Sequence, residues 1–125
     1  MVVLINKLTT MKNNSEYQDL IRTLLDCVLA CENCASACLQ EDDVKMMAGC
    51  VSLDRDCADI CALAARLLQR GADISLQYLL LCEEICRQCA TECSKHEHVH
   101  CQKCAEACNN CAQACHKYHE PITQN

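Results

Sequence analysis

The stretch CEEICRQCATEC, residues 82–93, decides the fold, and CVLACENCASAC, residues 27–38, repeats its cysteine spacing. Both follow the pattern C-x3-C-x2-C-x3-C. At about 100° per residue, four cysteines at this spacing fall within an arc of about 60° on a helix. Neither stretch alternates with the period of two that a half-buried strand requires. The spacing therefore predicts two equivalent helices, each with a stripe of thiols along one face.

Two further stretches place their cysteines in the same way. On helical geometry the cysteines of residues 50–61 fall within an arc of about 40°, and those of residues 101–115 within about 80°. We expect helices over about 15–40, 43–70, 73–95 and 98–119. The signals for their ends are a capping box at Ser15, aspartate caps at Asp42/Asp43 and at Asp73, a stop at Gly71, and Pro121 after the last helix.

Four helices of this length with short connections predict an all-α fold, an antiparallel up-down-up-down four-helix bundle. The expected organisation is an N-terminal arm over 1–14, the bundle over 15–120 and a tail over 121–125. The thiol stripes then occupy the inward positions that would ordinarily carry leucine. The centre of such a bundle is lined with sulfur.

The composition agrees with a core of this kind. The chain has 125 residues, of which 16 are Cys, with no Phe or Trp, two Gly and one Pro. Hydrocarbon alone gives such a chain a thin core. Two Gly and one Pro are too few for the turns of a loop-rich, disulfide-stapled fold. The cysteines must therefore fill the centre.

The N-terminus and the charge indicate a compartment and exclude some partners. The apolar run Val2 to Ile5 stops at Asn6 and Lys7, too short for a secretory signal, and no stretch is long enough for a membrane span. We therefore expect a cytoplasmic protein with reduced thiols and no membrane partner. A net charge of −6 without a basic stripe argues against nucleic acid as a partner.

Three interpretations of the thiols compete. Single buried cysteines often pack as small hydrophobic residues, but 16 of them at core positions on every helix are not ordinary packing. Disulfides within a helix would distort it, because Cβ atoms four residues apart lie about 5–6 Å from each other and a disulfide needs about 3.5–4.5 Å. Cross-helix disulfides remain open on oxidation. Metal ligation is the interpretation we favour.

The spacing and the charge indicate Cu(I) as the metal. A near-linear S–metal–S unit spans roughly 4.6 Å, which suits two thiolates at i and i+4, and Cu(I) prefers soft ligands in low coordination. Equal numbers of Cu(I) ions and bridging thiolates leave a buried core neutral, whereas four zinc tetrathiolate sites would leave a charge of about −8. The metal ligands we expect are Cys27, Cys31, Cys34, Cys38, Cys50, Cys57, Cys61, Cys82, Cys86, Cys89, Cys93, Cys101, Cys104, Cys108, Cys111 and Cys115.

The two ends of the bundle differ in chemistry. At the end with the first and third turns, thioether and imidazole groups can bind Cu(I) and form a metal entrance. These groups are Met46, Met47, His96, His98 and His100. The opposite end is an apolar plug of Leu20, Leu24, Ala64, Leu68, Tyr78 and Leu79. His119 and Asp54 are accessory candidates, although we expect Asp54 to form an ordinary surface ion pair.

Apolar residues also lie on the outer helix faces. Ile21, Leu25, Leu63 and Leu67 point away from the thiol stripes on helical geometry. Such outward apolar side chains predict packing between subunits, so we expect a homo-oligomer.

Two runs carry a resemblance to a known family. GCVSLDRDCADICALAA, residues 49–65, and CRQCATECSKHEHVHCQKCAEACNNCAQAC, residues 86–115, resemble the cytosolic copper storage proteins. The resemblance covers about residues 15–119. It implies a tetramer of four-helix bundles, each holding many Cu(I) ions through cysteine pairs. All sixteen cysteines match ligand positions, but Leu20 and Leu24 stand where the richest members carry cysteine, which implies a lower capacity.

The function we expect is storage or buffering of copper, with roughly 10–16 Cu(I) ions per chain if thiolates bridge. It is not an enzyme function. Two alternatives remain open at this point: an iron–sulfur electron carrier, and a copper sensor or shuttle. The cysteine run of bacterial ferredoxins ends in proline and lies in a loop that wraps the cluster. The runs of this chain lack that proline and lie on one helical face, which argues against the iron–sulfur alternative.

Overall fold

The structure is a computed structural model that describes the backbone of residues 15–123 and the side chains of residues 18–118. The predicted arm over 1–14 and the end of the tail lie outside the described residues. Within the described part, the chain forms four α-helices and a short 3-10 helix. They are α2 (Ser15–Cys38), η1 (Val44–Met47), α3 (Ala48–Gln69), α4 (Ser75–Ser94) and α5 (Val99–Thr123).

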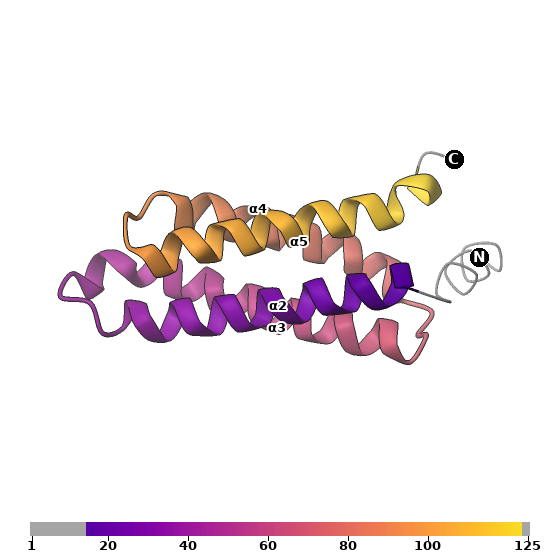
Figure 1. Cartoon of the computed structure of the whole chain (residues 1–125), viewed down its shortest axis with the longest axis horizontal. Helices are drawn as coiled ribbons and strands as arrows, with labels where there is room; N and C mark the ends of the chain where they lie inside the picture. Colours follow the sequence, from indigo (N-terminus) through magenta and orange to yellow (C-terminus); the bar gives the residue numbers. More distant parts are fainter. Residues whose placement is uncertain (1–14, 124–125) are drawn as a thin grey trace.

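The helices form the antiparallel bundle that the spacing predicts. Helix α2 packs against α3 and α5, and α4 packs against the same two helices, so α2 faces α4 across the diagonal. The α2–α3 and α4–α5 connections lie together at one end of the elongated molecule, and the α3–α4 connection lies at the other (Figure 1). The fold class predicted from the sequence is confirmed.

The end of α3 is fixed by a glycine, as predicted. Gly71 has φ 65°, in the left-handed region that glycine enters without steric cost. Its N–H donates to the carbonyl of Leu68 at 3.1 Å, and the N–H of Ala72 donates to the carbonyl of Leu67 at 3.0 Å. This pair of bonds is the Schellman motif, which satisfies carbonyls that the helix end leaves free.

The prediction that aspartates cap the second and third helices is wrong. Asp43 precedes η1 and makes no capping bond, because its carboxylate accepts instead from Nε2 of His98 at 3.3 Å. Helix α3 therefore begins only after one turn of 3-10 helix. Asp73 does not cap α4 either, because that helix begins at Ser75 with Ile74 at the capping position and no side-chain bond.

The last helix extends further than predicted. Helix α5 continues to Thr123 and thus passes through Pro121, where we expected it to have ended. Proline fixes φ at about −65°, which is itself a helical value, so the residue is compatible with the final turn of a helix. The side chains of this turn lie outside the described residues.

The core has a thiol part and an apolar part. All sixteen cysteines are fully buried. Beyond them, toward the α3–α4 connection, lie the buried side chains of Leu20, Leu24, Ala64, Leu68, Leu79 and Tyr118. This confirms an apolar plug, with Tyr78 only half-buried at its edge. Ile21 and Leu67 are buried within the chain, so they offer no exposed surface to another subunit, whereas Leu25 is 47% exposed.

No helix among the described residues is both long enough and apolar enough to span a bilayer.

Candidate metal centre

The thiols of the four helices form one continuous column. Sγ atoms on different helices lie 3.1–4.0 Å apart, from the closest pair, Cys50 and Cys93, to Cys50 and Cys101. Near the plug, Cys61 contacts Cys82 at 3.5 Å and Cys111 at 3.8 Å. Every member of the column is buried and free of disulfide bonds. The structure thus brings the sixteen predicted residues together.

Groups of four thiols within ligating distance overlap along this column. Cys27, Cys57, Cys61 and Cys86 form one such group, and Cys27 and Cys57 belong also to a second with Cys31 and Cys108. When two such groups are both occupied, the thiolates that they share bridge metal ions, whereas isolated tetrahedral sites share no ligand. The geometry therefore favours a chain of metal ions with bridging sulfur over separate zinc tetrathiolates.

Pairs at i and i+4 already lie near the separation that a metal would need. Their Sγ···Sγ distances are 3.8 Å for Cys34 and Cys38 and 3.9 Å for Cys104 and Cys108. Two-coordinate Cu(I) between them requires roughly 4.6 Å, so rotation about χ1 must open each pair by less than about 1 Å. The helices need not move apart to admit a metal between such a pair.

Asp54 lies inside the thiol column, which corrects the expectation of a surface ion pair. Its side chain is 0% exposed. The thiols of Cys89, Cys93 and Cys104 donate to Oδ1 at 3.2–3.3 Å, and the thiol of Cys50 donates to Oδ2 at 3.7 Å. Asp54 is four residues after Cys50, at the edge of the stripe where α3 meets α4 and α5. The carboxylate is thus enclosed by sulfur from three helices.

Burial changes the acid–base chemistry of this column. It raises the pKa of Asp54 to about 8, and the charge of the Cys104 thiolate acts in the same direction. Burial also raises the pKa of Cys38 to about 11, with the nearby charge of Cys50 as the next cause. The pKa of Cys101 is raised for the same two reasons. Without metal, Cys38 and Cys101 are therefore protonated at neutral pH, whereas hydrogen bonds from neighbouring thiols, that of Cys34 first, lower the pKa of Cys50.

His100 lies where the column reaches the surface. Its Nδ1 is 3.6 Å from Sγ of Cys34, 3.8 Å from Sγ of Cys38 and 3.6 Å from Sγ of Cys101. Its other nitrogen, Nε2, is 2.8 Å from Oε2 of Glu41. Among the three predicted entrance histidines, His100 is the one whose ring nitrogen lies against the thiols.

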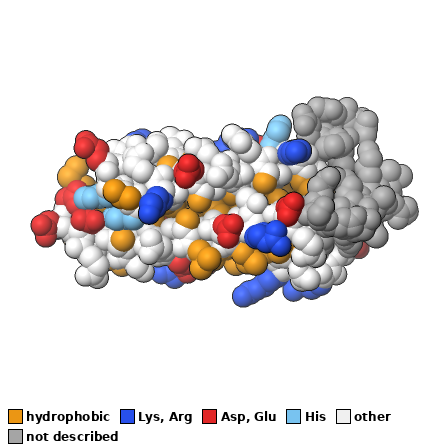
Figure 2. All heavy atoms as spheres, viewed as in Figure 1, with side chains coloured by type: hydrophobic (Ala, Val, Ile, Leu, Met, Phe, Trp, Pro, Cys, Tyr) orange, Lys and Arg blue, Asp and Glu red, His pale blue; other side chains and the backbone are white. Residues whose placement is uncertain are grey.

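The other two histidines lie further from the column and face carboxylates. Nδ1 of His98 is 3.4 Å from Glu41 and its Nε2 is 3.3 Å from Asp43, while Nε2 of His96 is 3.0 Å from Glu92. Figure 2 shows pale blue histidine spheres among red carboxylates at this end of the molecule. The sequence signal for this network was the run of three histidines, whereas nothing in the polar turn singled out Glu41.

The two methionines of the predicted entrance differ in exposure. Met47 is buried, whereas Met46 is 73% exposed. The angular placement of both methionines assumed an α-helix with 100° per residue up to Cys50, whereas η1 turns by about 120° per residue. The role of Met46 and Met47 at a metal entrance stays a prediction. The side chain of His119, the accessory candidate at the far end, lies outside the described residues.

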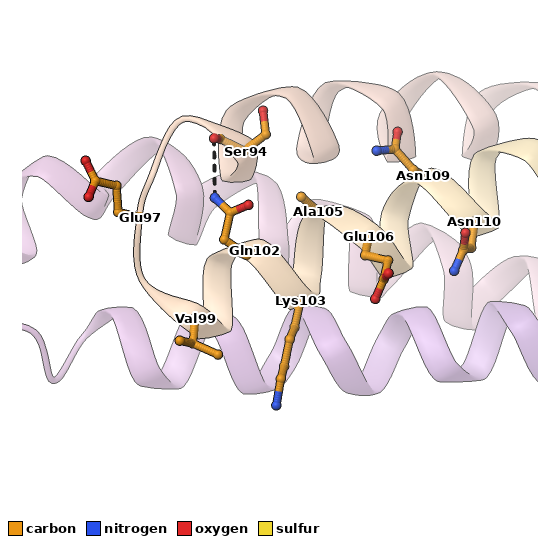
Figure 3. A pocket seen from close by; sticks show the side chains of 9 residues that line it. All are labelled: Ser94, Glu97, Val99, Gln102, Lys103, Ala105, Glu106, Asn109 and Asn110. Atoms are coloured by element: carbon orange, nitrogen blue, oxygen red, sulfur yellow. Dashed lines mark hydrogen bonds between the residues drawn. The ribbon is translucent and has the colours of Figure 1, made fainter.

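A hollow on the outside of α5 has no comparable cluster of thiol or imidazole ligands among its lining residues. It has a volume of about 590 Å³ and lies beside the α4–α5 connection, where Gln102 donates to the carbonyl of Ser94 at 3.4 Å (Figure 3). The side chains of Lys103, Glu106 and Asn109 line it without converging on a common point. The chemistry of this protein lies in the bundle core instead.

Fold and site together define a class of protein: a four-helix bundle whose core is a buried column of ligating thiols with one histidine-lined end. The cysteines all lie within helices, so the loop that wraps an iron–sulfur cluster in a ferredoxin has no counterpart among them. A family model described as copper storage protein matches residues 13–120. The chain belongs to the copper storage protein family.

Three relatives show how similar the family members are. The Cu(I)-bound copper storage protein BsCsp3 is 43% identical, with a TM-score of 0.79 over 82% of this chain and 97% of that one. The copper storage protein Ccsp of Streptomyces lividans, in a structure loaded with 10 copper equivalents, is 35% identical, with a TM-score of 0.80 over 91% of this chain and 96% of that one. An uncharacterized cysteine-rich protein of Bacillus subtilis, YhjQ, is 46% identical over 87 residues, 70% of this chain and 81% of its own length.

Proposed function

We propose that this protein stores or buffers Cu(I), holding roughly 10–16 ions per chain on the thiolates of its core. The observation that carries the proposal is the continuous column of sixteen fully buried thiols with overlapping groups of four. A shuttle or sensor needs only one exposed site, and a column of this length exceeds that need. The copper bound by BsCsp3 and by Ccsp supports the choice of metal.

The proposed ligands are the sixteen cysteines, with His100 at the entrance and Asp54 within the column. Each incoming Cu(I) replaces a thiol proton, so that metal and thiolate charges cancel in a core that contains no basic side chain among its buried residues. Storage requires no reaction at the metal beyond exchange of ligands. The proposed role is therefore not enzymatic.

We further propose that the protein works in the cytoplasm as a homo-oligomer, a tetramer as the family resemblance implies. The S. lividans relatives are described as cytosolic, which supports the compartment. Leu25, Leu29, Leu80 and Leu81 are exposed on α2 and α4, which supports packing between subunits. Light scattering of the reduced protein at micromolar concentration tests the assembly, and a mass of one chain at all concentrations contradicts it.

An anaerobic titration tests the storage function. Reduced apoprotein is titrated with Cu(I) in the presence of a chromophoric chelator, and the end point is the ratio at which the chelator begins to colour. We expect at least ten Cu(I) per chain. An end point at four or fewer ions defeats the proposal, because so small a capacity fits a shuttle or a structural site.

A further inference from the structure

Glu41 holds two connections of the bundle together at the entrance. It lies in the connection between α2 and η1, while its partners His98 and His100 belong to the connection before α5 and to the first turn of that helix. Its Oε2 is 2.8 Å from Nε2 of His100 and 3.4 Å from Nδ1 of His98. The carboxylate therefore contacts both rings from across the end of the bundle.

The contact determines which nitrogen of His100 carries hydrogen. A carboxylate only accepts hydrogen bonds, so Nε2 must be the N–H that donates to Glu41. In the neutral imidazole, Nδ1 then keeps its lone pair. That lone pair is on the side of Cys34, Cys38 and Cys101, whose Sγ atoms lie 3.6–3.8 Å from Nδ1. A lone pair at this position can accept a thiol proton or bind a soft metal ion.

The ring of His100 is also held from its face. His98 stacks on it with a centroid distance of 5.3 Å and an interplanar angle of 5°. Nε2 of His98 is in turn 3.3 Å from Oδ1 of Asp43. Glu41 at the edge of the His100 ring and His98 at its face together fix its orientation, with Nδ1 toward the thiols.

We propose that Glu41 is a positioning residue for copper uptake, one that holds His100 with its Nδ1 lone pair directed at Cys34, Cys38 and Cys101. This rests on the proposed binding of Cu(I) by the core. Glu41 does not itself bind the metal. It keeps the histidine ring in the orientation that receives an ion at the entrance. Glu41 therefore increases the rate of loading and leaves the number of bound ions unchanged.

The test measures the first step of loading. Reduced, full-length apoprotein is mixed anaerobically by stopped flow with one equivalent of Cu(I) as its bicinchoninate complex, and loss of the chelator colour gives the transfer rate. Loss of a residue that orients a metal ligand weakens metal binding or activity by about 10–100-fold. We expect Glu41→Ala to slow transfer by about tenfold, with the saturation capacity equal to that of the wild type.

Three control variants separate positioning from charge and from folding. Asp42→Ala removes the same charge one residue later, from an exposed side chain, and leaves the rate unchanged. Glu41→Gln keeps an oxygen that accepts from Nε2 and restores most of the rate. In a His100→Ala background, Glu41→Ala has no further effect, because the two residues act as a unit. Imidazole ¹⁵N spectra of the apoprotein show a single Nε2–H tautomer for His100 in the wild type and averaging in Glu41→Ala.

Opposite results overturn the inference. If Asp42→Ala and Glu41→Gln both slow transfer as Glu41→Ala does, the effect is attraction of the cation by charge. If Glu41→Ala slows transfer equally with His100 absent, Glu41 acts on the loops and not through the ring. Failure of the storage proposal has a separate signature, a low saturation capacity in every variant including the wild type.

Discussion

At the scale of single residues, Asp54 is the side chain whose environment departs most from the sequence expectation. An aspartate among charged neighbours such as Arg55 and Asp56 is usually a surface residue, yet it is enclosed by four thiols. Its angle on the helix, about 40° from Cys50, was compatible with either position. The position of Asp54 is decided by how the other helices pack around α3, which brings thiols of α4 and α5 to its carboxylate and which local spacing does not contain.

The raised pKa of Asp54 gives the apoprotein a distinct pH dependence. Below about pH 4 the group is protonated in both the folded and the unfolded chain. Between pH 4 and its folded pKa of about 8, the unfolded chain loses the proton and the folded chain keeps it. The free energy of unfolding contributed by this group therefore falls as pH rises, by at most about 1.4 kcal/mol per pH unit.

Replacement of Asp54 by asparagine removes this dependence. We expect urea unfolding of the reduced apoprotein to show lower stability at pH 7.5 than at pH 5.5 in the wild type, and a smaller difference in Asp54→Asn. Asp56→Asn, an exposed change two residues away, keeps the wild-type difference. Equal pH dependence in all three proteins would mean that Asp54 is ionised in the folded state.

Removal of one thiol from the middle of the column tests the ligands individually. Sγ of Cys108 lies 3.6–3.9 Å from those of Cys31, Cys27, Cys57 and Cys104. We expect Cys108→Ala to lower the Cu(I) capacity by about one ion and to leave the apoprotein helical, since both side chains are small and apolar. Chelator titration and circular dichroism measure the two effects. A loss of most of the capacity contradicts independent bridging sites.

At the scale of elements, the cysteine spacing was sufficient to predict four helices and their inward faces, because sixteen constraints on helical angle agree. The starts of the second and third helices, α3 and α4, were not predictable in the same way. Asp43 and Asp73 have the sequence of caps, but Asp43 bonds to His98, which lies 55 residues away in the chain. Likewise, the 3-10 turn of η1 that displaces Met46 follows from how the connection closes over the bundle end, not from local propensity.

Helix α2 sets where the thiol column stops. Leu24 is fully buried in the plug, three residues before Cys27. We expect Leu24→Cys to lengthen the column and add about one Cu(I) to the capacity, while the lost packing destabilises the apoprotein by about 2 kcal/mol or more. Titration in competition with a chelator measures the gain.

The matched control for this change is Leu25→Cys. Leu25 is 47% exposed, so a thiol there faces solvent and adds no ion that competes with the chelator. If both variants or neither gained an ion, extension of the buried column would not be the reason.

At the scale of the whole molecule, filling the core exchanges protons for metal. Because burial raises the pKa of thiols such as Cys38 to about 11, these groups carry protons at neutral pH, and Cu(I) must displace them. We expect release of about one proton per ion in a weakly buffered anaerobic titration, and an apparent affinity that increases with pH. Proton release near zero would contradict this exchange, because it would mean that thiols such as Cys38 are already ionised in the apoprotein.

The central claim is that the missing hydrocarbon core is a compartment for copper, and elemental analysis of protein purified anaerobically from copper-fed cells tests it most directly. The prediction is ten or more copper atoms per chain, with little zinc and no iron. Four or fewer metal ions per chain, or zinc or iron with acid-labile sulfide in place of copper, would contradict it.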